Sequence, residues 1–111
     1  MAKIDFSRGD VPKAREEIEA ALRTSAYNPD YLYVLGKVLE AQQEWQRALE
    51  AFQKTVLVNP RESDAYYEMG QVYARLGDRA RAVRAAEKAV ELSPEDADYK
   101  RALQVLAGTK P

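Results

Sequence analysis

Paired carboxylates are the clearest candidates for acid–base chemistry in this chain of 111 residues, which has no histidine and no cysteine. Glu16 precedes Glu17, and Glu95 precedes Asp96. Adjacent residues of a helix point to different sides, so neither pair converges on one substrate. We interpret both pairs as solvated surface, and an acid–base pair is the alternative. The sequence predicts no catalytic residue, no metal site and no cofactor, and therefore a protein that is not an enzyme.

The remaining composition excludes other classes of chemistry. Without cysteine there is no disulfide, no thiolate nucleophile and no sulfur-ligated metal. The five glycines are too scattered for a phosphate-binding loop. A formal net charge of −1 disfavours a nucleic-acid partner, because affinity for nucleic acid comes largely from clustered cations. With 46% hydrophobic and 32% charged residues, the chain is expected to form one globular domain.

The first residues, MAKIDFSRGD, lack the apolar segment of a secretion signal. No stretch of the sequence predicts insertion into a membrane. A soluble, cytoplasmic protein is therefore favoured, although the sequence does not name a compartment.

The chain repeats itself with a period of 34 residues. The segment PDYLYVLGKVLEAQQEWQRALEAFQKTVLVNPRE aligns without a gap with SDAYYEMGQVYARLGDRARAVRAAEKAVELSPED. Small residues, prolines and apolar positions shift together: Gly36 to Gly70, Ala48 to Ala82, Pro60 to Pro94, Leu32 to Tyr66, Leu35 to Met69 and Leu39 to Tyr73. A fixed period of this length is typical of stacked helical repeats.

Each unit is predicted to be a pair of antiparallel helices. Apolar residues from Leu32 to Leu39 follow the spacing of one helix face. A short break follows, QQE in one unit and LGD in the other, and a proline closes each unit. Glycine at a crossing lets two helix backbones approach each other closely. The expected neighbours are Ala48 and Phe52 for Gly36, and Ala82 and Ala86 for Gly70.

These residues resemble the tetratricopeptide repeat, a 34-residue helix–turn–helix unit with the pattern W-x₂-L-G-x₂-Y, then A-x₃-F, then P. The matching residues are Leu32, Leu35, Gly36, Leu39, Ala48, Phe52 and Pro60 in one unit, and Tyr66, Met69, Gly70, Tyr73, Ala82, Ala86 and Pro94 in the next. The departures are mild, such as Ala86 in place of the large aromatic. The resemblance implies an all-α fold, an α-α superhelix formed as a right-handed solenoid of antiparallel helix pairs, with about six helices.

The two ends of the repeat array are unequal. Residues 1–28 match mainly the second helix of an earlier unit, with Asp10 as its N-cap and Pro12 near its start. Residues 29–62 and 63–96 are full repeats. Residues 97–108 form one further helix that ends at Gly108, which we interpret as a cap of the array. Either the chain is a fragment of a longer array or it begins abnormally.

The resemblance also implies protein–protein interaction, because the first helices of successive units line a concave groove in this family. Carried over position by position, the groove would contain Asp30, Tyr33, Lys37, Glu40, Ala41, Asp64, Tyr67, Gln71, Ala74, Arg75, Asp98, Arg101 and Val105. Tyr33 and Tyr67 are in register and would offer rings and hydroxyls to a peptide, although tyrosines that only fill space are the alternative. Some members hold the terminal carboxylate of a chaperone peptide; here the asparagines are absent and acidic residues crowd Lys37, so this ligand is rejected. The predicted function is a scaffold that binds a peptide or partner protein.

Self-association is the second hypothesis. Without the usual first helix, the helix from Val11 to about Arg23 would leave an apolar stripe partly open, with only Ile4 and Phe6 nearby. The stripe consists of Ala14, Ile18, Ala21 and Leu22. A weak homodimer through this surface is therefore expected.

A basic run occupies the second helix of the last full unit and consists of Arg79, Arg81, Arg84 and Lys88. In the family this surface faces solvent, and Glu87 and Glu91 interrupt it here. We interpret it as a solvated surface, and a phosphate site is the alternative. An RNA-binding helical repeat is a third hypothesis that fits poorly, because such repeats are far more basic.

Overall fold

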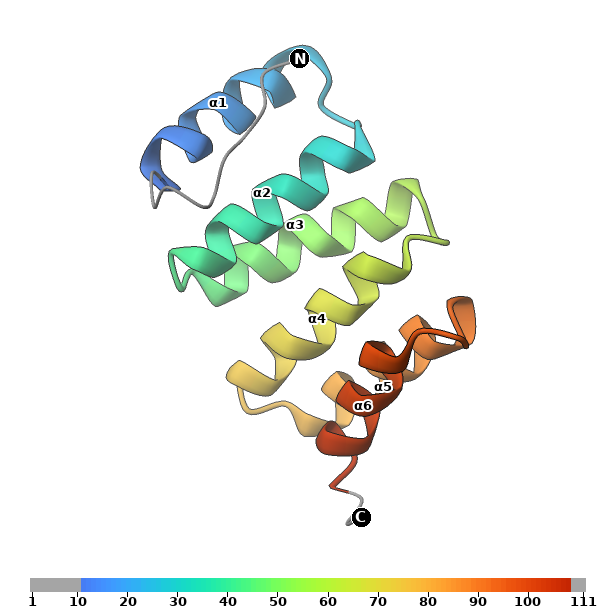
Figure 1. Cartoon of the computed structure of the whole chain (residues 1–111). Helices are drawn as coiled ribbons and strands as arrows, with labels where there is room; N and C mark the ends of the chain where they lie inside the picture. Colours follow the sequence, from blue (N-terminus) through green and yellow to red (C-terminus); the bar gives the residue numbers. More distant parts are fainter. Residues whose placement is uncertain (1–10, 109–111) are drawn as a thin grey trace.

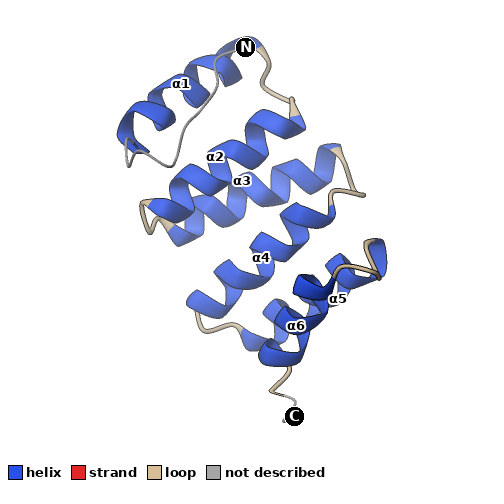
Figure 2. Cartoon of the chain, in the orientation of Figure 1, coloured by secondary structure: helices blue, strands red, loops and turns tan. Residues whose placement is uncertain are grey.

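The computed structural model describes residues 11–108, and within them the chain forms six α-helices and no strand (Figures 1 and 2). The helices are α1 (Val11–Thr24), α2 (Pro29–Ala41), α3 (Trp45–Val58), α4 (Ser63–Arg75), α5 (Arg79–Leu92) and α6 (Ala97–Leu106). The all-α prediction is therefore confirmed. The predicted N-cap Asp10 and the predicted shields Ile4 and Phe6 lie outside the described residues.

The helices stack in chain order. Each one packs mainly against the helix before it and the helix after it, as in a repeat array. Figure 1 shows α3 behind α2 and α5 behind α6. The first residues of α2, α4 and α6 are each 34 residues apart, so the period of the sequence is also the period of the structure. The stack is elongated and measures 43 × 25 × 22 Å.

The turns inside the two helix pairs have the same geometry. The backbone N–H of Glu44 donates to the carbonyl of Leu39, and that of Asp78 donates to the carbonyl of Tyr73, both at 2.9 Å. The residue before each donor has a left-handed backbone, with φ 62° at Gln43 and 81° at Gly77. This is the arrangement of a Schellman motif, which ends a helix and reverses the chain in few residues.

Polar caps explain where α2 and α6 begin. The side chain of Asn28 accepts hydrogen bonds from the backbone N–H groups of Asp30 and Tyr31 at 2.9 and 3.2 Å. Asp96 accepts in the same way from the second and third residues of α6. These bonds satisfy donors that have no partner inside the helix. At the other end of α6, Gly108 takes φ 69°, as the sequence predicts for a residue that ends a helix.

The two helix glycines mark the closest crossings. A Cβ atom added to Gly36 would lie 2.4 Å from Cε1 of Phe52, and Phe52 is completely buried. A Cβ at Gly70 would lie 3.2 Å from the carbonyl oxygen of Ala82 and 3.6 Å from the backbone nitrogen of Ala86. The predicted contacts of Gly36 with Phe52, and of Gly70 with Ala82 and Ala86, are therefore confirmed.

The predicted open stripe on α1 is wrong for its first two residues. Ala14 and Ile18 retain only 4% and 1% of their exposure, because they form a small core with Val38 of α2. Ala21 and Leu22 are half-buried at the edge of this core. The prediction considered only the missing first helix, whereas the next unit's first helix also packs against this side of α1. The stripe is thus largely internal.

Candidate functional site

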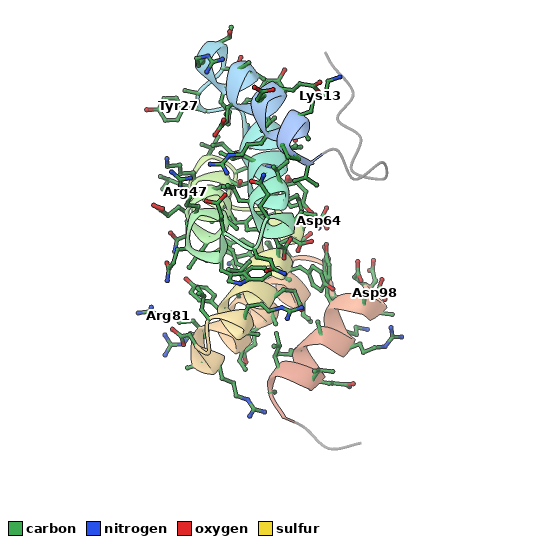
Figure 3. All side chains as sticks on the ribbon, turned by 90° about the vertical axis from the view of Figure 1, so that its left-hand side faces the viewer. Lys13, Tyr27, Arg47, Asp64, Arg81 and Asp98 are labelled. Atoms are coloured by element: carbon green, nitrogen blue, oxygen red, sulfur yellow. The ribbon has the colours of Figure 1, made fainter. Side chains whose placement is uncertain are left out.

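Side chains of α2, α4 and α6 form one face of the stack, which we call the α2–α4–α6 face. In Figure 3, Asp64 of α4 and Asp98 of α6 lie on one side, and Tyr27, Arg47 and Arg81 lie on the opposite side. The predicted groove residues come from these three helices. The α2–α4–α6 face is therefore the surface to which the prediction of a groove refers.

A charge cluster joins α2 to α4 on this face. Lys37 Nζ donates to Glu68 Oε2 at 3.0 Å and lies 3.7 Å from Glu40 Oε1. Glu68 is a charged side chain that is almost fully buried, with 8% exposure of the residue. A buried carboxylate needs such a partner, because an unpaired charge is costly away from water. Two carboxylates share one ammonium group here, so the cluster carries an excess of negative charge whenever both are ionised.

Burial and these charges shift the titration of three groups, Glu40, Tyr33 and Lys37. Burial, followed by repulsion from Glu68, raises the pKa of Glu40 from 4.5 to about 7. Burial also raises the pKa of the Tyr33 hydroxyl, and the charges of Glu68 and Asp64 add to the effect. The pKa of Lys37 is also raised, because its contacts with Glu68 and Glu40 outweigh the opposing effect of burial. The site therefore favours a cationic group over a carboxylate.

The two tyrosines in register each make a contact inside the protein. The ring of Tyr33 packs against Phe52, with centroids 5.7 Å apart. The ring of Tyr67 stacks on Tyr99 of α6 at 5.1 Å and an interplanar angle of 28°. The Tyr99 hydroxyl donates to Asp64, which ties α6 to α4. Both tyrosines nevertheless stay partly exposed, so they fill space between helices and also contribute to the surface.

A cleft of about 280 Å³ separates α4 from α6 on this face. Its lining consists of Tyr67, Gln71, Asp98, Arg101, Ala102, Val105 and Leu106. Five of these, Tyr67, Gln71, Asp98, Arg101 and Val105, are among the predicted groove residues. Val105 is 71% exposed, and Arg101 Nη1 donates to Asp98 Oδ1 at 3.3 Å. The cleft offers an apolar floor with one positive and one negative side chain at its edge.

Other predicted groove residues lie apart from this cleft. The guanidinium of Arg75 lies over the ring of Trp45, 5.5 Å from its centroid. Asp30 is exposed in the first turn of α2. Two residues that contact predicted groove residues, Glu68 and Tyr99, are not among them. From the sequence, Glu68 is expected only as one of the acidic residues that crowd Lys37, and Tyr99 only as part of the apolar side of its helix. A signal for Glu68 was available, since a carboxylate at a core position requires a partner.

The structure also bears on membrane and metal chemistry. Among residues 11–108, no helix has the length and apolar character that crossing a membrane requires. In the same residues, no group of three or more acidic side chains is arranged to hold a metal ion.

Comparison with known proteins identifies the family. One tetratricopeptide repeat profile matches residues 35–107, and a second matches residues 1–66. The chain belongs to the tetratricopeptide repeat family. No curated protein sequence matches it. Neither profile is that of an enzyme family.

Solved structures of tetratricopeptide repeat proteins superpose closely on the chain. MamA matches 93% of this chain with a TM-score of 0.87 at 24% identity, and the chain spans 60% of the matched MamA chain. The first repeat domain of Spaghetti (RPAP3), bound to the HSP90 peptide SRMEEVD, matches 93% of this chain and 82% of its own at 18% identity and a TM-score of 0.88. The type III secretion chaperone SycD of Yersinia enterocolitica, in complex with a peptide of the translocator YopD, matches 96% of this chain and 86% of its own at 16% identity and a TM-score of 0.83. At these identities, the likeness extends to the fold.

Proposed function

We propose that this tetratricopeptide repeat chain binds a peptide or a segment of a partner protein on its α2–α4–α6 face. The observation that carries the proposal is the cleft between α4 and α6, where the exposed Val105 lies among Tyr67, Gln71 and Arg101. Tyrosine and arginine are enriched at protein interfaces, and here both border an exposed apolar side chain. Two solved members of the same fold are complexes with peptides, which supports a binding role.

The charges on this face indicate which peptides would bind. Glu40 and Glu68 lie around the single ammonium of Lys37, and Asp64 adds negative charge near the Tyr33 hydroxyl. A peptide carboxylate placed there would meet repulsion, whereas a lysine or arginine side chain would be attracted. The ligand is therefore a segment with basic side chains, and an acidic peptide such as SRMEEVD is a poor fit.

Binding of labelled peptides to the whole chain tests the proposal. The probes are a panel of short peptides with lysine, arginine and apolar residues, together with SRMEEVD as the acidic comparison. Val105→Arg places charge and bulk in the cleft, and we expect it to weaken binding of the basic peptides at least tenfold. Leu57→Arg is the matched control, because Leu57 is exposed and belongs to α3, outside the α2–α4–α6 face. Equal affinities for both variants, or tighter binding of SRMEEVD, would rule the proposed site out.

Self-association stays a separate prediction with a reduced surface. Since Ala14 and Ile18 are buried, only Ala21 and Leu22 of the predicted stripe are available to a second copy. A charge introduced at Ile18 would disrupt the core between α1 and α2 and would not report on a dimer. The mass of the parent chain at several concentrations is therefore the measurement that decides this prediction.

A further inference from the structure

A second and larger groove lies away from the α2–α4–α6 face. It has a volume of about 550 Å³, with α1 and α3 on its two sides and Leu32, Leu35 and Leu39 of α2 in its floor. The exposed large apolar side chains within residues 11–108 are Tyr27, Leu57, Val58 and Val105, and the first three border this groove. Tyr27 and Leu57 are 80% and 81% exposed. Soluble proteins rarely leave such side chains together without a use.

The next repeat shows the same position with larger side chains in its floor. One period later, Tyr66, Met69 and Tyr73 replace the three floor leucines, and the space shrinks to about 240 Å³. The Tyr73 hydroxyl also accepts a hydrogen bond from Gln53 of α3 at 3.3 Å. Leucine cannot fill this space or accept such a bond. The first groove is therefore open because of its sequence and not because of the fold alone.

The charged side chains beside the two grooves also differ. Lys88 of the second unit lies 3.6 Å from Glu91, three residues later on the same helix. Lys54 occupies the equivalent position in the first unit, but Leu57 stands where the glutamate would be. Among the described residues Lys54 forms no ion pair. The first groove thus combines an exposed leucine with an ammonium group that lacks the acidic neighbour of its counterpart.

We propose that this groove, between α1 and α3, binds an amphipathic helix of a partner protein that carries apolar residues on one side and glutamate or aspartate along the edge. The floor leucines are spaced i, i+3 and i+7 along α2, which matches two turns, or about 10 Å, of an incoming helix. A helix presents anchors at the same spacing to an apolar groove. No strand is present in residues 11–108 to which an extended peptide could add.

The acidic edge of the partner follows from the cations beside the apolar floor. Arg47 and Lys54 both line the groove and are one i, i+7 step apart on α3. Arg47 already donates to Glu44 at 3.1 Å, so Lys54 is the cation with which the partner would pair. An acidic side chain near Lys54 would supply the charge that Glu91 supplies in the second unit. A basic partner helix would meet repulsion at the same place.

A synthetic peptide tests the proposal with the whole chain. The probe is a capped, dye-labelled helical peptide of about fourteen residues, with leucines at i, i+3, i+4 and i+7 and glutamates on the flanks. A second peptide has lysine in place of each glutamate. Leu57→Glu places in the first groove a counterpart of Glu91 in the second groove. We expect this variant to weaken binding of the glutamate peptide at least tenfold. Lys54→Glu should reverse the preference, so that the lysine peptide binds more tightly than the glutamate peptide.

Two further variants make the result specific. Val105→Arg, on the α2–α4–α6 face, should leave the affinity of the glutamate peptide unchanged. Glu91→Leu exposes a leucine beside Lys88, but the second groove stays filled by Tyr66 and Tyr73, so it should add no binding site. All four substituted positions are exposed, and circular dichroism would verify that the helices are retained.

Three outcomes would overturn the proposal. The first is that the glutamate peptide does not bind the parent up to millimolar concentration, and the second is that it binds parent and Leu57→Glu equally. The third is concentration-dependent association of the parent in sedimentation that Leu57→Glu abolishes, because the occupant would then be a second copy of the chain. Binding of the basic peptides to the parent and to Val105→Arg is measured separately. Each of the two proposed sites can therefore be supported or rejected without the other.

Discussion

Glu40 and Glu68 share the ammonium group of Lys37, and this arrangement connects single residues to the pH dependence of stability. The pKa of Glu40 is raised to about 7 by burial and by Glu68, with Tyr33 as a further neighbour. The folded state therefore keeps a proton on Glu40 between about pH 4.5 and 7, where the unfolded state releases it. By linkage, this residue lowers the free energy of unfolding as the pH rises through that range.

Replacing Glu40 with glutamine should remove this dependence. Glutamine keeps the shape and cannot ionise, so we expect Glu40→Gln to match the parent near pH 5 and to be more stable by about 1–2 kcal/mol near pH 8. Urea unfolding followed by circular dichroism at pH 5, 6, 7 and 8 measures the difference. Glu50→Gln, at an exposed position of α3, is the control and should show no such trend. A variant that is less stable than the parent at pH 8 would mean that the contact with Lys37 outweighs the burial of the charge.

The turns inside the two helix pairs differ in one residue, and this difference affects the free energy of unfolding. Gly77 and Gln43 occupy equivalent positions and both have a left-handed backbone, which costs a non-glycine residue about 1 kcal/mol. We expect Gln43→Gly to raise the free energy of unfolding by about 0.5–1 kcal/mol and Gly77→Gln to lower it by about 1 kcal/mol. Thermal and urea unfolding would give both values.

A glycine one residue earlier provides the control for the turn. Gln42 has φ −86°, so glycine there relieves no strain, loosens the unfolded chain and removes the side chain that accepts a hydrogen bond from Arg15. Gln42→Gly should therefore be slightly less stable than the parent. Equal stabilisation by Gln42→Gly and Gln43→Gly would show that the left-handed geometry is not the cause.

Most of the helices could be predicted because the 34-residue period shows which positions of successive units are equivalent. Gly36 opposite Phe52, and Gly70 opposite Ala82, follow from small residues that recur 34 positions apart. The left-handed backbone of Gln43 could be inferred from the sequence only because Gln43 aligns with Gly77 of the next unit. The exposure of α1 was predicted wrongly, since Ile18 packs against Val38 of the following helix. A pattern within one helix predicts its apolar face, but not which neighbour covers that face.

For the whole molecule, the sequence predicts which residues share the α2–α4–α6 face better than it predicts the contacts that those residues make. Tyr67 and Arg101 do line a cleft, but the stacking of Tyr67 on Tyr99 needs the packing of α6 against α4. The groove between α1 and α3 was not predicted, because its floor leucines read as core. The exposed Leu57 carried a signal, since its counterpart in the second unit is Glu91. Comparison of aligned units finds such a site where a single helix does not.

Because each described helix packs mainly on its neighbours in the chain, stability should vary along the stack. Helices α3 and α4 lie in the middle and contribute the fully buried Phe52 and Val72, so their amides should exchange with solvent most slowly. Helix α1 lies at one end of the described stack. Arg15 of α1 ties it to the following pair, with Nη1 2.9 Å from Gln42 Oε1 and 2.5 Å from Glu44 Oε2. Loss of the Arg15 side chain should therefore loosen α1 without opening the rest of the stack.

We expect Arg15→Met, which keeps the apolar part of the side chain, to speed hydrogen exchange in α1 by about tenfold and to leave α4 and α5 unchanged. Exchange followed by NMR at a single pH would resolve the helices separately. Arg79→Met is the complementary variant, because Arg79 Nε donates to the Leu106 carbonyl at 2.8 Å and links α5 to the end of α6. It should speed exchange in α6 and leave α1 unchanged. If either variant accelerates all six helices by the same factor, the stack unfolds as one cooperative unit, and the inference of graded local stability is wrong.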